Sequence, residues 1–186
     1  LNGAQITVRL LERQGIRIIA GIPGGAALPL YDALGQSTLI HHVLARHEQG
    51  AGFMAQGMAR VTGRPAVCIA TSGPGATNAI TGIADAFLDS IPLVVITGQV
   101  ATNLIGTDAF QEAPVSNIMG AVAKHCFLVT DPAKLEATVR TAFEIARSGR
   151  PGPVVIDIPK DVQNWAGTYQ GSGLLPVRGY HARMQA

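Results

Sequence analysis

The chain has 186 residues, 47% of them hydrophobic and 14% charged, so it is long enough for one sizeable core and too short for two full ones. Its 14 Lys and Arg against 12 Asp and Glu give a formal net charge of +2, and no stretch clusters basic with aromatic residues, which argues against a nucleic-acid partner. No apolar run approaches the roughly 18 residues of a membrane span, which argues against a membrane protein.

Helical and strand patterns alternate along the chain. The expected helices cover 3–15, 28–36, 47–63, 74–90 and 132–149, and the expected strands cover 16–23, 39–45, 65–72, 92–100, 125–130 and 152–159. Strands that are apolar almost throughout and separated by helices are typical of a parallel sheet covered on both faces. The sequence therefore predicts a doubly wound α/β fold with a parallel sheet of about six strands and helices on both faces.

Two stretches break this alternation. Residues 99–113 have no clear period and exceed the usual α/β connection of about 2 to 6 residues, as functional loops often do. From Gln163 on, Gly, Pro and scattered aromatic residues replace periodicity. We expect one domain over 1–162 and, over 163–186, a linker toward a domain that is absent from the chain.

Two glycine-rich turns follow expected strands, at 21–28 and 69–79. Neither satisfies the P-loop or the dinucleotide-binding pattern, and either can be a simple α/β junction. Both nevertheless lie at the carboxyl ends of expected parallel strands, where open α/β sheets bind their ligands. Taken alone, each turn therefore favours a structural junction, and a ligand at this edge of the sheet is the alternative.

The pair His47 and Glu48 starts like a zinc-protease motif, but Ala51 stands where the second histidine belongs, so we expect no metal site. Cys68 and Cys126 lie in apolar runs and are expected to be buried thiols in a reducing cytoplasm. Because residue 1 is Leu, removal of an organellar targeting segment is left open.

Glu48 opens the expected helix 47–63, which is rich in glycine and alanine. The helix dipole favours an acid in a first turn whatever its function. Small side chains, however, let neighbouring elements approach closely and exclude water, which suits a carboxyl group that exchanges a proton. Both interpretations of Glu48 stay open on composition alone.

Several segments together resemble the acetohydroxyacid (acetolactate) synthases, a family of thiamin diphosphate-dependent enzymes. These are "GIPGGAALPLYDAL", "ARHEQGAGFMAQGMAR", "TSGPGATNAITGIADAFLDSIPLVVITGQV", "IGTDAFQE" and "SGRPGPVVIDIPKDVQ", in the family's order and spacing. The resemblance runs from about Ala4 to Val162 and implies the N-terminal domain that binds the pyrimidine end of the cofactor. It implies decarboxylation of pyruvate and condensation with a second 2-keto acid, pyruvate or 2-ketobutyrate, in branched-chain amino acid biosynthesis.

The resemblance also assigns roles to residues. It implies that Glu48 hydrogen-bonds the N1′ atom of the aminopyrimidine ring and, with Gln111, serves catalysis. The residues it places around the cofactor's pyrimidine end and the reaction space are Gly24, Gly25, Glu48, Pro74, Asn78 and Gln111. It places Ala26, Phe110 and Lys160 on the substrate channel, and Arg150 against an FAD that most members keep without redox use.

The family binds the cofactor's diphosphate through Mg²⁺ with a Gly-Asp-Gly motif that does not occur in these 186 residues. The resemblance therefore implies that another domain holds Mg²⁺, that the complete enzyme is a homodimer or tetramer, and that the isolated chain is inactive. Whether a small regulatory subunit binds is left open. Ala101 replaces the family's usual proline, which bears on herbicide affinity.

Other functions remain open. Within the family these are glyoxylate carboligase, which lacks the glutamate that Glu48 supplies, the catabolic acetolactate synthase, which "AFQE" and "RPGPVVIDIPKD" disfavour, and pyruvate oxidase. Outside it stands a non-catalytic module of the same fold.

Overall fold

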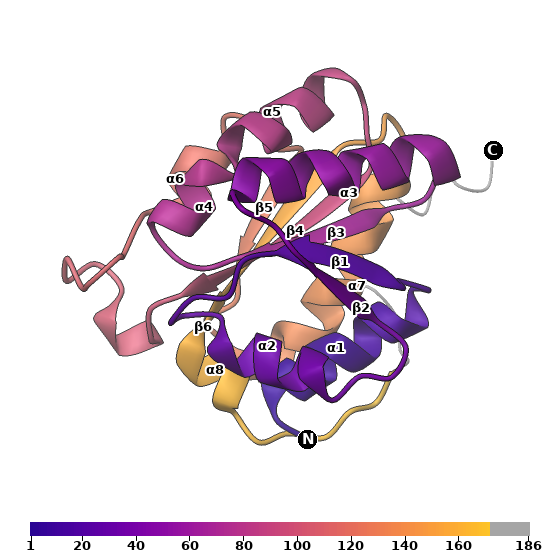
Figure 1. The fold of residues 1–186 in the computed structure, drawn as a ribbon. Helices are drawn as coiled ribbons and strands as arrows, with labels where there is room; N and C mark the ends of the chain where they lie inside the picture. Colours follow the sequence, from indigo (N-terminus) through magenta and orange to yellow (C-terminus); the bar gives the residue numbers. More distant parts are fainter. Residues whose placement is uncertain (172–186) are drawn as a thin grey trace.

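A computed structural model describes residues 1–171 and shows a parallel sheet between two layers of helices (Figure 1). The strands are β1 (Ile18–Gly21), β2 (His41–Leu44), β3 (Ala66–Ala70), β4 (Leu93–Gln99), β5 (His125–Leu128) and β6 (Pro153–Pro159). The helices are α1 (Gly3–Arg13), α2 (Leu28–Gly35), α3 (Glu48–Thr62), α4 (Pro74–Asn78), α5 (Ile80–Leu88), α6 (Val115–Met119), α7 (Leu135–Arg147) and α8 (Lys160–Asn164), with 3-10 turns η1 (Thr102–Leu104) and η2 (Pro132–Lys134).

The strand order is β2-β1-β3-β4-β6-β5, and every pairing is parallel. From β1 the chain first moves outward to β2 and then crosses back to β3 on the other side of β1. The order therefore reverses between β1 and β3. In open α/β sheets a crevice forms at such a switch point, outside the carboxyl ends of the strands, and ligands bind there.

Both faces of the sheet are buried, which confirms the predicted doubly wound α/β fold. In β3, Val67 and Ile69 face the core under α1, α2, α7 and α8, whereas Cys68 faces the core under α3 to α6. In β4, Val94 and Val95 divide in the same way. Because successive side chains of a strand point to opposite faces, an uninterrupted apolar run is what a sheet covered on both sides requires.

The two cores differ in side-chain size. The core under α1 and α7 contains large residues such as Phe143 and Leu11, whereas α3 and α5 contribute mainly alanines. These small residues let α3 and α5 approach closely: a Cβ on Gly52 would lie 3.5 Å from the Cα of Gly82. The Gln56 Nε2 donates to the Gly82 carbonyl oxygen at 2.5 Å across the same contact. The glycine and alanine content of 47–63 thus serves close helix packing.

All six predicted strands are present, but the predicted helix over 74–90 is two helices. α4 ends at Asn78 and α5 begins at Ile80. The Ala79 N–H donates to the Ala76 carbonyl oxygen at 3.1 Å, a bond to the third preceding residue that tightens the turn and interrupts the α-helical ladder. The consequence is that Asn78 sits at a helix end and not in a helix interior.

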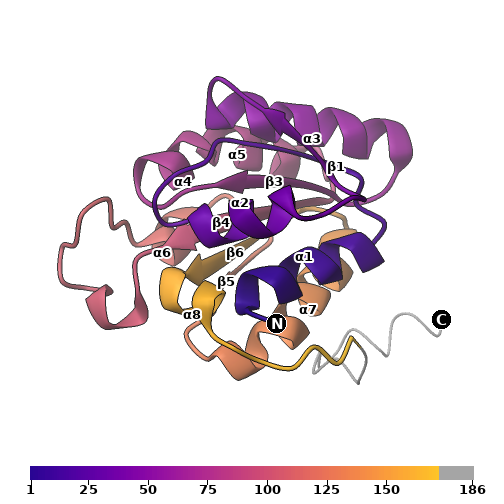
Figure 2. The ribbon, with the colours of Figure 1, turned by 60° about the horizontal axis from the view of Figure 1, so that its bottom comes forward.

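The chain after α8 runs back along α1 and α7, beside the N-terminus (Figure 2). The Gly167 N–H donates to the Leu1 carbonyl oxygen at 2.8 Å, and Asn2 and Ala166 form an antiparallel bridge. The first part of the predicted linker, up to residue 171, therefore packs on the domain. Residues 172–186 of that prediction lie outside the described residues, and the domain boundary at 162 stays a prediction.

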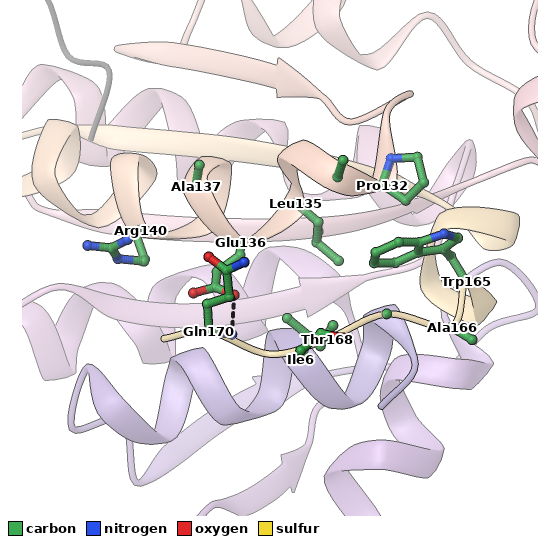
Figure 3. A pocket seen from close by; sticks show the side chains of 12 residues that line it. Ile6, Pro132, Leu135, Glu136, Ala137, Arg140, Trp165, Ala166, Thr168 and Gln170 are labelled. Carbon is green, nitrogen blue, oxygen red and sulfur yellow. Dashed lines mark hydrogen bonds between the residues drawn. The ribbon is translucent and has the colours of Figure 1, made fainter. Parts of the chain in front are cut away.

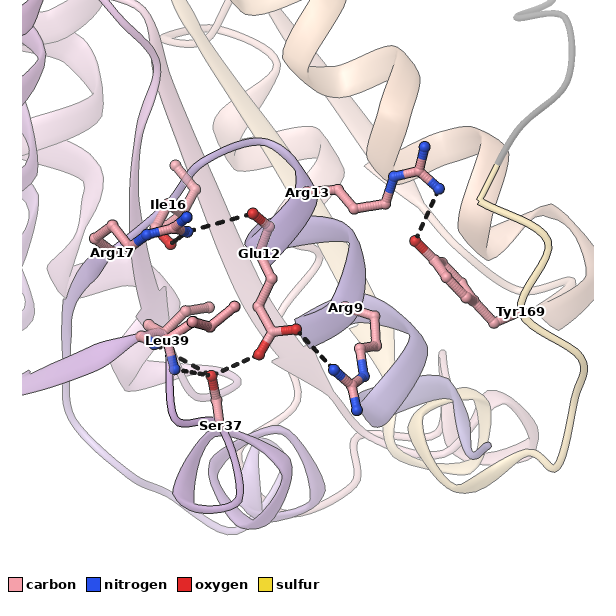
Figure 4. A network of polar contacts seen from close by, with 9 residues as sticks. Arg9, Glu12, Arg13, Ile16, Arg17, Ser37, Leu39 and Tyr169 are labelled. Atoms are coloured by element: carbon pink, nitrogen blue, oxygen red, sulfur yellow. Dashed lines mark hydrogen bonds and ion pairs between the residues drawn. The ribbon is translucent and has the colours of Figure 1, made fainter.

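A polar network fixes α1 to the turn before β2 (Figure 4). The Glu12 carboxylate accepts from Arg9 Nη1 at 3.2 Å and from Ser37 Oγ at 2.7 Å. Arg13 donates to the Tyr169 hydroxyl at 3.4 Å and so joins the same helix to the returning chain. These contacts lie away from the carboxyl edge of the sheet and stabilise the scaffold.

Candidate functional site

Glu48 lies at the carboxyl edge of the sheet as the first residue of α3. The His47 side chain caps the helix by accepting from the Gln49 N–H at 3.1 Å. The Glu48 side chain is 9% exposed, and its Oε2 accepts from Asn78 Nδ2 at 3.0 Å. Within residues 1–171 the other oxygen, Oε1, has no hydrogen-bond partner. A buried carboxylate with one free acceptor can bind a polar hydrogen of a ligand.

The two glycine turns meet at the Thr71 side chain, close to Glu48. A Cβ on Gly24 would lie 2.5 Å from the Thr71 Cβ, and a Cβ on Gly75 would lie 2.7 Å from the Thr71 Cγ2 and 3.3 Å from Glu48 Oε1. Only glycine fits at these two positions, whereas a Cβ on Gly25 would meet nothing within 4 Å. The turns after β1 and β3 therefore pack together on the Thr71 side chain, and Gly75 brings the second turn close to the Glu48 carboxylate.

Among residues 1–171, two buried polar atoms without hydrogen-bond partners lie in β2 and directly after β3. The Thr71 Oγ1 and the His42 Nε2 are buried and have no hydrogen-bond partner in the described part of the chain. His42 packs edge-on against the Tyr31 ring at 5.0 Å, and burial lowers the pKa of His42. Burial, with smaller contributions from Cys68 and Glu48, raises the pKa of Tyr31 above its ordinary range. An unpaired buried donor or acceptor is costly, so these atoms mark where a polar ligand would be stabilised.

The loop after β4 approaches the same crevice. Gly73 has a φ of +46°, and a Cβ there would collide with the backbone of Gln111. Gln111 itself has a φ of 58°, and its neighbour Phe110 is 86% exposed. The structure thus brings the backbone of Gln111 next to the Ser-Gly-Pro-Gly turn, while the Phe110 side chain faces outward.

The remaining predicted site residues divide into two groups. Ala26 follows β1 and Lys160 follows β6, both at the carboxyl edge, and Gln163 Nε2 donates to the Ala26 carbonyl oxygen at 2.8 Å. Pro74 starts α4 on the same edge. Arg150 precedes β6 and therefore lies at the amino edge, opposite Glu48. Its guanidinium donates to the carbonyl oxygens of Phe87 and Leu88 at 3.3 and 3.0 Å and caps the end of α5.

Sequence reasoning missed three residues of this region: Tyr31, Thr71 and Asp157. Asp157 is 1% exposed in β6 and accepts from Thr97 Oγ1 at 2.7 Å and from Gln99 Nε2 at 2.9 Å. An acid inside the apolar run 152–159 was a usable signal, because a carboxylate is rarely buried without partners.

A cavity of about 540 Å³ lies elsewhere, between α7 and the returning chain (Figure 3). Leu135, Pro132 and Trp165 form its apolar side, and the Glu136 carboxylate accepts from the Gln170 N–H at 3.0 Å. None of the predicted site residues lines it.

Within residues 1–171 no group of three or more His, Cys, Asp and Glu side chains is arranged to hold a metal ion. Over the same range no helix has both the length and the apolar character needed to cross a membrane.

The fold and the site define a class: a doubly wound α/β domain that places one buried carboxylate and two glycine turns at the carboxyl edge of its sheet, by the switch point. The chain belongs to the thiamine pyrophosphate enzymes, because the model of their N-terminal TPP binding domain matches residues 1–120.

Relatives of known function are similar to nearly the whole chain. The chain is 64% identical to the acetolactate synthase isozyme 1 large subunit of Escherichia coli over 87% of its length, and 56% identical to the acetolactate synthase large subunit of Corynebacterium glutamicum over 98%. It is 50% identical to the chloroplastic acetolactate synthase of Arabidopsis thaliana over 98%. It spans 29%, 30% and 27% of these three relatives, respectively.

Proposed function

We propose that this chain is the aminopyrimidine-binding domain of an acetolactate synthase large subunit. The complete enzyme would decarboxylate pyruvate and condense the remaining two-carbon unit with pyruvate or 2-ketobutyrate. The observation that carries the proposal is the Glu48 carboxylate, which is 9% exposed and keeps Oε1 without a partner in the described residues. The similarity to acetolactate synthases over nearly the whole chain supports the choice of reaction.

The crevice fits the pyrimidine end of thiamin diphosphate. A Cβ on Gly24 or Gly75 would collide with the Thr71 side chain, so only glycine lets the two turns pack this closely on Thr71, beside the place where we put the flat ring. The unpaired Thr71 Oγ1 can donate a hydrogen bond to the polar edge of such a ring or accept one from it, and the unpaired Glu48 Oε1 can accept one. When bound, thiamin diphosphate supplies the carbon nucleophile and the electron sink that decarboxylation of a 2-keto acid requires.

The chain's own residues would then hold and move a proton. Glu48 Oε1 would share a proton with the ring nitrogen N1′, while Asn78 Nδ2, 3.0 Å from Oε2, keeps the carboxyl group oriented. Water is scarce around a side chain this buried, so the hydrogen bond to the ring would be stronger than in solvent. Gln111 would lie at the reaction space, and Ala26, Phe110 and Lys160 would line the substrate channel.

Further parts of the proposal concern groups held outside this domain. Another domain would bind Mg²⁺ and the diphosphate, and the complete enzyme would be a cytoplasmic homodimer or tetramer. FAD would be a structural cofactor. Arg150 is the proposed FAD contact, and its guanidinium would keep its hydrogen bonds to the end of α5 while the ring of Phe87 lies 5.9 Å from it.

The test is acetolactate formation from pyruvate. The enzyme is the protein encoded by the longest reading frame that contains this chain, and it is supplied with thiamin diphosphate, Mg²⁺ and FAD. Glu48→Gln should lower kcat by about two orders of magnitude or more, the scale of acid–base contributions. Glu144→Gln, which alters a surface ion pair with Arg147, is the matched control and should change kcat less than about twofold. Equal activity of wild type and Glu48→Gln would refute the role of Glu48, and an inactive wild type would favour a non-catalytic module.

A further inference from the structure

The loop from Val100 to Pro114 has no core of its own. None of its residues from 101 to 114 is buried, and most are exposed. Such a loop gains little from apolar burial, so its position depends on polar contacts at its ends. It carries Phe110 and Gln111, and it reaches the crevice where the Gln111 backbone meets Gly73.

The Gln99 side chain joins the two ends of this loop. Its Oε1 accepts from the Val100 N–H at 2.9 Å, at the first residue of the loop. Its Nε2 donates to the Ala113 carbonyl oxygen at 3.0 Å, near the last residue. Gln99 is 3% exposed, and both bonds are partly buried. One amide group therefore closes a segment of more than ten residues.

Asp157 determines which way that amide points. Its Oδ2 accepts from Gln99 Nε2 at 2.9 Å, and its Oδ1 accepts from Thr97 Oγ1 at 2.7 Å. If the Gln99 amide were turned over, its oxygen would face both the Asp157 carboxyl group and the Ala113 carbonyl oxygen, and its NH₂ would face a backbone donor. The bonds to Val100 and Ala113 would be lost, and the bond to Asp157 would be lost as well while its carboxyl group is ionised, so the ionised carboxyl group reinforces this orientation.

Contacts inside the loop make it move as a unit. The Glu112 carboxylate accepts from the Ala109 N–H at 3.1 Å and from the Gly106 N–H. At the other side of the loop, Asp161 accepts from the Thr102 N–H at 3.0 Å. A displacement of the two loop ends, at Val100 and Ala113, would therefore also shift the segment that carries Phe110 and Gln111.

We propose that Gln99 and Asp157 are positioning residues for the carboligation reaction. Their buried side chains hold together the two ends of the loop from Val100 to Pro114. They thereby keep Gln111 against the Ser-Gly-Pro-Gly turn, at the substrate side of the site. This inference rests on the proposed function. The hydrogen bonds of Gln99 and Asp157 go to Thr97, Val100 and Ala113 and to each other, and not to Glu48 or the Gly24–Gly25 turn, so the clamp reaches the reaction space only through Gln111 and should affect pyruvate more than the recognition of the aminopyrimidine ring.

The test compares wild type with the variants Gln99→Met and Gln99→Glu. Each is the protein encoded by the longest reading frame, assayed with all cofactors. Methionine keeps the volume and removes all three hydrogen bonds, and an ionised glutamate cannot donate to Asp157 or to the Ala113 carbonyl oxygen. Each variant should raise the KM for pyruvate by about tenfold or more, equivalent to one strong hydrogen bond. The half-saturating concentration of thiamin diphosphate should change less than about twofold.

Adding Asp157→Asn to Gln99→Glu supplies an amide donor opposite the new carboxylate. The double variant should recover part of the lost pyruvate affinity, which a general loss of stability would not allow. Gln36→Met, at an exposed position after α2, is the matched control. Hydrogen exchange of peptides from 100–113 should accelerate about tenfold in Gln99→Met while peptides of β4 and β6 stay protected.

Unchanged exchange of 100–113 in Gln99→Met would overturn the proposal. Equal losses in pyruvate and thiamin diphosphate affinity, or no recovery in the double variant, would overturn it as well. If the wild type forms no acetolactate, the proposed function fails, and the exchange comparison still decides whether these side chains hold the loop.

Discussion

Asp157 should make the stability of this domain fall as the pH rises through neutrality. Burial raises the pKa of Asp157 from 3.8 to about 7, and the bonds from Thr97 and Gln99 offset only part of that rise. At about pH 5 the unfolded chain has lost this proton while the folded chain retains it, so the folded state binds more protons. Stability is therefore fully retained below the unfolded pKa and declines as the pH approaches the folded pKa.

The magnitude follows from the shift. Each pKa unit corresponds to about 1.4 kcal/mol, so a group with a pKa of about 7 in the folded state loses about 2 to 3 kcal/mol of stabilisation between pH 5 and pH 8. His42 and His125 act in the opposite direction over the same range, because burial lowers the pKa of each. Cys126, which also interacts with Asp157, has a pKa of about 11 and stays neutral.

The difference between wild type and Asp157→Asn removes the histidine contributions, which both proteins share. We expect urea unfolding of the 186-residue chain to show the variant gaining about 2 to 3 kcal/mol relative to wild type as the pH rises from about 5 to 8. Asp32→Asn, at an exposed position of α2, is the control and should show a constant difference. A constant difference for Asp157→Asn, or one of opposite sign, would refute the reasoning.

Three further substitutions test the packing of the site and the core. Gly24→Ala should weaken thiamin diphosphate binding about tenfold or more, because its Cβ meets the Thr71 side chain, whereas Gly25→Ala has open space and should bind normally in the same titration. Asn78→Ala removes the donor to the buried carboxylate and should lower kcat by about tenfold without lowering the melting temperature by more than a few degrees. Phe143→Ala, in the core under α1 and α7, should cost about 3 to 5 kcal/mol in urea unfolding; a cost below about 1 kcal/mol would contradict the packing described.

Hydrophobic periodicity was enough to predict the architecture, since the inner strands β3, β4 and β6 are buried along their whole length and their sequences are apolar almost throughout. It could not predict the break at Ala79, because a switch from α-helical to tighter hydrogen bonding leaves the apolar pattern of 74–90 unchanged. The order of strands, with the reversal between β1 and β3, was likewise outside what a local pattern contains.

The candidate site was predictable where the residues lie in local motifs. Glu48 at a helix start and the glycine turns after two strands follow from short stretches of sequence. Asp157 was missed because its hydrogen-bond partners, Thr97 and Gln99, lie 60 and 58 residues away along the chain. Thr71 was missed for a similar reason: its role depends on Gly24, which only the fold brings to it.

The most direct test of the central claim compares the affinities of two ligands: thiamin diphosphate and an analogue in which carbon replaces the ring nitrogen N1′. Both are measured on the cofactor-free protein encoded by the longest reading frame, as wild type and as Glu48→Gln. If Glu48 Oε1 binds that nitrogen, the analogue should bind wild type about tenfold or more weakly than the cofactor, and the two should bind Glu48→Gln about equally. An analogue that binds wild type as tightly as thiamin diphosphate, or a preference that persists in Glu48→Gln, would contradict the proposed role of Glu48.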